Sequence, residues 1–174
     1  KIPAMSNFDR LKQLLELSYE FSPKYTKNSL ETYISRQDLL EYLKRCQPHE
    51  EEDIYKILGQ DSALSKLRPP FFSFFYLENE IRREVFEKIP FDRWGIAIFD
   101  INWEFRVKLD EILNEKEKYM LSAYLGQMDA SGIDLDSVSI VRETIGREVQ
   151  IILKRRNDAG KNTDDENDKN ENVA

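Results

Sequence analysis

Carboxylates are the side chains of this sequence that could most readily do chemistry, because Asp and Glu bind cations and act as acids or bases. The segment from Asp129 to Ser137 places Asp129, Asp134 and Asp136 around a glycine, as some calcium-binding loops do. Its spacing does not follow the EF-hand pattern, and no Glu closes the loop. A simpler interpretation is that Asp134 or Asp136 caps the helix expected to follow.

A second pair of carboxylates, Asp100 and Glu104, is close enough in sequence to share a cation. Arg106 stands where a restriction-type nuclease site would carry Lys, so an ion-paired surface explains these residues more simply. Either group of carboxylates supports the hypothesis that the chain is a metal-assisted enzyme or a cation-regulated protein.

Histidine and cysteine offer little for catalysis or metal binding, because the chain contains only His49 and Cys46. A zinc site built from these residue types needs three or four ligands, and they supply two at most. The sequence has no Gly-x-Ser-x-Gly elbow and no glycine-rich phosphate loop. We therefore assign no catalytic residue, expect no metal or other cofactor, and leave open whether the chain is an enzyme.

Aromatic residues are concentrated in one part of the chain. Of ten Phe, eight Tyr and two Trp, eleven fall between Phe71 and Phe105. Large aromatic side chains dominate both protein cores and protein interfaces. This stretch is therefore either the folding centre or a docking surface, and the residues proposed for docking are Phe71, Phe72, Trp94 and Trp103.

Composition and charge indicate which classes of partner this chain could bind. The net charge of −7 and the scarcity of clustered Lys and Arg argue against binding a nucleic-acid backbone. No apolar run is long enough to cross a membrane, and a single cysteine excludes an internal disulfide. We expect another protein as partner, with no nucleic acid and no membrane, in a cytoplasmic or nuclear setting; a homo-oligomer is possible.

The elements that must position these residues are mostly helices. Periodic apolar residues predict helices at 6–21, 36–46, 49–58, 110–125 and 137–155, the last with a stripe at Val138, Val141, Ile145, Val149 and Ile152. Residues 94–109 instead alternate apolar and polar, with a one-residue slip at Phe99-Asp100, and this pattern favours a hairpin or bulged strand. A heptad-like seam from Phe91 to Phe105 is the competing interpretation, one continuous helix.

The predicted architecture is a single globular domain over residues 1–156, followed by a disordered acidic tail at 157–174 that lacks the apolar residues needed to fold. Its fold class is α+β, mostly helical, with a small hairpin or short antiparallel sheet around residues 94–109. The alternative is an all-α bundle. The favoured function is a non-enzymatic protein–protein interaction module, or a subunit of an intracellular assembly, that docks through an aromatic-rich surface.

Overall fold

The computed structural model describes residues 36–58 and 63–171, so the helix predicted for 6–21 lies outside the described residues. Its elements in chain order are α3 (Arg36–Arg45), α4 (Pro48–Leu58), α5 (Ala63–Leu67), the 3₁₀ helix η1 (Phe72–Tyr76), α6 (Asn79–Lys88), α7 (Phe91–Ala97), α8 (Trp103–Asp110), α9 (Glu115–Ser131) and α10 (Leu135–Glu171). These residues contain no strand, so the fold is all-helical and the α+β prediction is wrong.

The predicted hairpin at residues 94–109 is replaced by two short helices, α7 and α8. The slip at Phe99-Asp100 marks the turn between them, where Asp100 adopts a left-handed backbone conformation with φ of 53°. The alternation that resembled a strand has another cause. On a helix, residues two apart point to nearly opposite sides, so Phe105 is buried while Val107 is exposed. The single continuous helix is not formed either.

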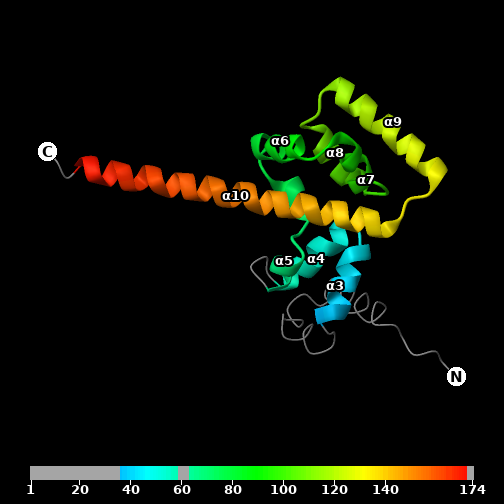
Figure 1. Ribbon diagram of the computed structural model, residues 1–174, viewed down its shortest axis with the longest axis horizontal. Helices are drawn as coiled ribbons and strands as arrows, with labels where there is room; N and C mark the ends of the chain where they lie inside the picture. The colour runs from blue at the N-terminus through cyan, green and yellow to red at the C-terminus, as the bar shows by residue number, and fades with distance from the viewer. Residues whose placement is uncertain (1–35, 59–62, 172–174) are drawn as a thin grey trace.

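Helix α10 is the axis of the molecule. Helices α6 to α9 lie on one side of it and α3 to α5 on the other (Figure 1). The apolar stripe predicted for this helix is confirmed, since all five of its side chains are buried: Val138, Val141, Ile145, Val149 and Ile152. One amphipathic helix thereby supplies core residues to several neighbours, among them α6, α7, η1 and α3.

The buried apolar side chains form two clusters on either side of α10. The larger cluster contains residues of η1 and of the helices from α6 through α10. Among them are Phe74, Phe75, Trp94, Phe105 and Ile145. The smaller cluster is built by α3 to α5 around Leu43, Ile54 and Tyr55. Adjacent residues of one chain segment enter different clusters, because Phe71 belongs to the larger and Phe72 to the smaller. The Pro69–Phe72 segment therefore crosses from one half of the molecule to the other.

Beyond the body, α10 continues to Glu171 and projects as a rod (Figure 1). Its described side chains from Asp158 to Lys161 are exposed. The division into a domain at 1–156 and a disordered tail at 157–174 stays a prediction. Among the helices of the two described ranges, none combines the length and the apolar character needed to cross a membrane.

A glycine permits α10 to pass directly over the two prolines that precede η1. A Cβ atom on Gly146 would lie 2.5 Å from the carbonyl oxygen of Pro69, which is a backbone atom and cannot rotate away. Alanine normally stabilises a helix interior by roughly 0.5–1 kcal/mol over glycine. Here the steric overlap outweighs that gain.

We expect Gly146→Ala to lower the free energy of unfolding by about 1–3 kcal/mol, the usual range for overpacking a core. The matched control is Gly126→Ala in α9, where nothing lies within 4 Å of the added methyl group and stability is expected to rise. Urea unfolding followed by circular dichroism measures both changes. A stabilised Gly146→Ala protein would contradict the close approach of α10 to Pro69.

Candidate functional site

Three of the four aromatic residues proposed for docking are buried. Relative exposure is 1% for Phe71, 4% for Phe72 and 0% for Trp94. The turn into η1 directs the rings of Phe71 and Phe72 into the two clusters. Trp103, by contrast, is 72% exposed, the only one of the four at the surface.

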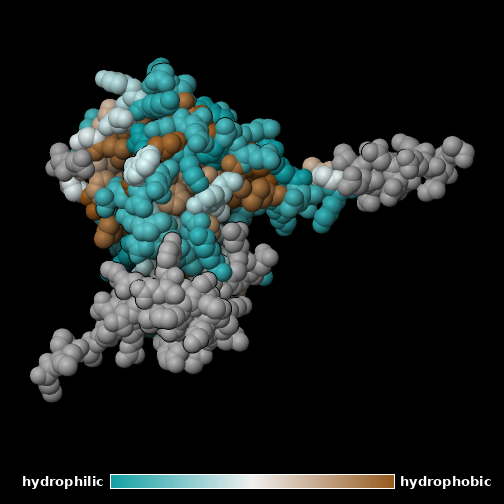
Figure 2. Space-filling model, turned by 180° about the vertical axis from the view of Figure 1, so that it is seen from behind, coloured by the Kyte–Doolittle hydropathy of each residue, from teal (hydrophilic) through white to brown (hydrophobic). Residues whose placement is uncertain are grey.

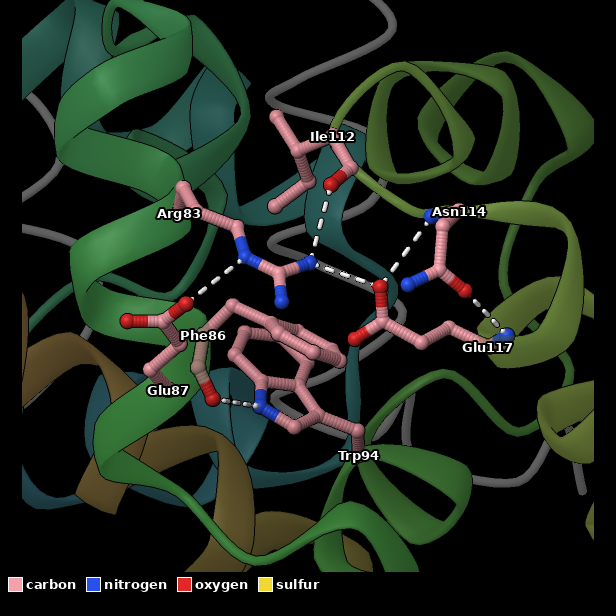
Figure 3. A network of polar contacts seen from close by, with 7 residues as sticks. All are labelled: Arg83, Phe86, Glu87, Trp94, Ile112, Asn114 and Glu117. Carbon is pink, nitrogen blue, oxygen red and sulfur yellow. Dashed lines mark hydrogen bonds and ion pairs between the residues drawn. The ribbon is translucent and has the colours of Figure 1, made fainter.

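Trp94 packs against α6 and contacts Phe86 of that helix (Figure 3). Its indole N–H donates to the carbonyl oxygen of Phe86 over 3.0 Å, and its ring stacks on the Phe86 ring with centroids 5.2 Å apart. A buried Trp needs a partner for its one polar group, and here it has one. Trp94 is thus a core residue with both its apolar and its polar requirements met.

The polar contacts above Trp94 fix α6 against α9 (Figure 3). Arg83 donates to Glu87 of its own helix over 3.0 Å, to the carbonyl oxygen of Ile112 over 3.1 Å and to Glu117 over 2.7 Å. Glu117 also accepts from the backbone N–H of Asn114, completing a capping box at the start of α9. This network has a structural role: it fixes α6 against α9, the helix that carries Leu125 near Trp103.

Helix α8 has two apolar faces. Phe105 and Leu109, four residues apart, point into the core, with exposures of 4% and 0%. Trp103 and Val107, also four residues apart, point outward, and Val107 is 45% exposed. Exposed apolar side chains that include a Trp are common in protein-binding surfaces.

A cavity of about 340 Å³ opens beside Trp103. Its apolar lining comes from Ile98, Phe99, Ile101 and Leu125, with Asp100 and Arg106 at its polar edge. We call Trp103, Val107 and this cavity the Trp103 surface. On the face drawn in Figure 2, hydrophobic residues are exposed in patches among the hydrophilic ones. The cavity has room for a large apolar side chain but, in the part of the chain that the structure describes, brings no catalytic set of groups together.

A buried polar seam, made of Glu51, Arg68 and Arg142, lies where the two apolar clusters meet, and sequence reasoning missed it. Arg142 donates to three backbone carbonyl oxygens: Ala97 at 2.8 Å, Phe99 at 3.1 Å and Cys46 at 3.4 Å. It thereby joins α10 to the end of α7 and to the turn after α3.

Glu51 is 3% exposed and accepts the backbone N–H of Phe72 over 2.8 Å. Burial raises the pKa of this carboxyl to about 7, against the opposing effects of the Phe72 hydrogen bond and the charges of Arg68 and Arg142. A perturbed pKa in a cleft would suggest a functional acid, but Glu51 faces the interior. One signal in the sequence could have found it: Glu51 precedes the buried Ile54 and Tyr55 by one helical turn.

The carboxylates proposed for cation binding are only partly described, because the side chain of Asp129 lies outside the described part of the structure. Among the side chains that the structure describes, no group of three or more His, Cys, Asp or Glu could hold a metal ion. Asp134 instead accepts from the backbone N–H of Asp136 at 3.1 Å and from the Ser137 hydroxyl at 3.3 Å, at the start of α10. This is the capping interaction that the sequence suggested. The metal-assisted hypothesis stays a prediction.

His49 and Cys46 occupy separate environments. The His49 ring nitrogen Nδ1 lies 3.0 Å from the side-chain nitrogen of Asn102, which places the start of α4 beside Trp103. Cys46 is buried, contacts the carbonyl oxygen of Leu43, and has a thiol pKa raised by burial. A protonated, enclosed thiol is a poor nucleophile.

The arrangement around Trp103, an exposed indole at the edge of a largely apolar cavity, is thus the best candidate for a functional site. Comparison with known proteins adds no further assignment: no protein-family model matches the chain, and no curated protein or solved structure matches it.

Proposed function

We propose that this chain is a non-enzymatic interaction module that binds another protein through the Trp103 surface. The observation that carries the proposal is the exposure of Trp103, 72%, at the edge of an apolar cavity of about 340 Å³. A tryptophan left in water gives up a large hydrophobic gain. A partner that covers the indole and fills the cavity recovers that gain.

The contrast between the two tryptophans supports this function. Trp94 has its ring enclosed and its N–H bonded to a carbonyl, whereas most of the Trp103 ring meets solvent. Trp103 also begins α8, on the same face as Val107 and next to the cavity. A helix therefore fixes the backbone that presents the indole, so little backbone entropy is lost on binding.

The test compares Trp103→Ala with wild type in affinity capture and in thermal unfolding. We expect the captured partner to be lost, with affinity weakened more than about 30-fold, the effect of removing an interface hot spot. Stability should change by less than about 0.5 kcal/mol, because the removed side chain is at the surface.

The matched control is Tyr119→Ala on α9, another exposed aromatic residue, with 77% exposure. It should capture the same partner at the wild-type amount. Equal capture by all three proteins would refute docking at the Trp103 surface.

A further inference from the structure

We propose that the partner segment bound at the Trp103 surface is basic, with one apolar anchor flanked by Lys or Arg. This inference rests on the proposed function, and it adds the charge of the partner. The anchor follows from the apolar cavity, and the flanking charge follows from the carboxylates around it. Complementary charge at an interface raises the association rate and excludes wrong partners.

Unpaired carboxylates border the surface. Asp100 lines the cavity and Glu104 follows Trp103 on α8. Across the described ranges, neither of these carboxylates makes a salt bridge.

The basic side chains near the surface are already engaged. Arg106 pairs with Asp110 over 3.1 Å, one turn along α8. Lys56 pairs with Glu52 over 3.4 Å. These two cations are neutralised locally. Lys108 of α8 makes no salt bridge among the described residues and adds one positive charge, so the unpaired carboxylates outnumber the unpaired cations here.

Tyr76, which packs against Phe105 of α8 with ring centroids 6.4 Å apart, already accommodates a cation on that side of the helix. The ammonium nitrogen of Lys108 lies 3.7 Å from the centroid of the Tyr76 ring, a cation–π contact. The Tyr76 hydroxyl donates to Glu52 over 2.7 Å, and the ring is more than half exposed.

The pKa of Tyr76 is raised mainly by desolvation, and nearby carboxylates add to the effect. Desolvation, the hydrogen bond to Glu52, and the charges of Glu52, Glu104 and Asp53 raise the pKa of Tyr76 to about 12. A Lys or Arg supplied by a partner at the Trp103 surface would meet Asp100, which lines the cavity, and Glu104, which follows Trp103. The face therefore offers an apolar pocket for an anchor and a negatively charged border for flanking cations.

The experiment uses a random-peptide phage library, selected on the immobilised full chain after depletion on the Trp103→Ala protein. The enriched peptides are expected to carry an aromatic or large aliphatic residue flanked by Lys or Arg. Their binding should weaken steeply with salt, because exposed charge pairs are screened.

The carboxylates are then removed in the double variant Asp100→Asn/Glu104→Gln. It should weaken a selected basic peptide about 10-fold at low salt and little at high salt. The control variant, Glu143→Gln/Asp158→Asn, removes the same number of charges from α10 and should leave binding unchanged.

Each outcome decides between the proposals. Basic peptides that depend on Trp103 and on the two carboxylates support both the site and its charge preference. Trp103-dependent peptides that are neutral or acidic overturn the charge preference and leave the docking site standing. If no enriched peptide depends on Trp103, both the docking site and the inference drawn from it are refuted.

Discussion

Replacement of Arg142 by alanine is expected to destabilise the fold by about 3–5 kcal/mol, the cost of removing one member of a buried charged network. Arg142 is 7% exposed, and its guanidinium donates to the carbonyl oxygens of Ala97, Phe99 and Cys46. Without it these acceptors lose their charged donor, and each buried acceptor left unsatisfied costs a further desolvation penalty. Arg142 also lies over the Phe71 ring, so the truncation removes packing as well.

Two further variants separate charge from packing. Arg142→Lys keeps the positive charge but cannot reproduce the fork of donors that reaches three carbonyls, so most of the loss should remain. Arg147→Ala removes an arginine from the same helix whose salt bridge is to Glu143, four residues away on the surface. That control should cost no more than about 0.5 kcal/mol. Urea unfolding measures all three, and equal small losses for Arg142→Ala and Arg147→Ala would contradict the role of the seam.

Glu51→Gln is expected to change the pH dependence of stability. Burial raises the pKa of Glu51 from 4.5 to about 7 in the folded chain, so the folded state retains this proton over a range in which the unfolded chain has lost it. The free energy of unfolding therefore falls as the pH rises from about 4.5 to about 7. The loss is on the order of 3 kcal/mol, since one pKa unit corresponds to about 1.4 kcal/mol.

Glutamine cannot ionise, and its carbonyl oxygen can still accept the Phe72 N–H. The variant should match wild type near pH 4.5 and be the more stable protein near pH 8. Urea unfolding at a series of pH values gives the two profiles. Profiles that stay parallel across this range would show that Glu51 does not titrate there.

The two seam substitutions should also be coupled. Arg142 lowers the cost of a charged Glu51, so losing the arginine leaves that carboxylate with less compensation. In the Glu51→Gln background, Arg142→Ala should therefore cost less than in wild type. A double-mutant cycle measures the coupling, with about 0.5–3 kcal/mol expected for residues in one network.

Much of the helical architecture could be predicted from local patterns. The stripe from Val138 to Ile152 repeats over several turns, and such a long period predicts both a helix and its buried face. Pro48 followed by acidic residues correctly marks the start of α4. The segment from Trp94 to Leu109 was misread because α7 and α8 are too short for a helical period to stand out. Two short helices joined by a turn can then resemble a bulged strand.

For the candidate site, too, some features could be predicted from the sequence and others only from the fold. The sequence by itself determined that the aromatic residues between Phe71 and Phe105 are central to this protein, because so much apolar surface must be buried or bound. It also determined the helical face that α10 contributes. Only the tertiary structure decided that Trp94 is enclosed while Trp103 is exposed, and that Glu51 and Arg142 are both buried close enough for their charges to interact. The physical reason is that burial depends on which distant segments pack over a residue, and no local pattern contains that information.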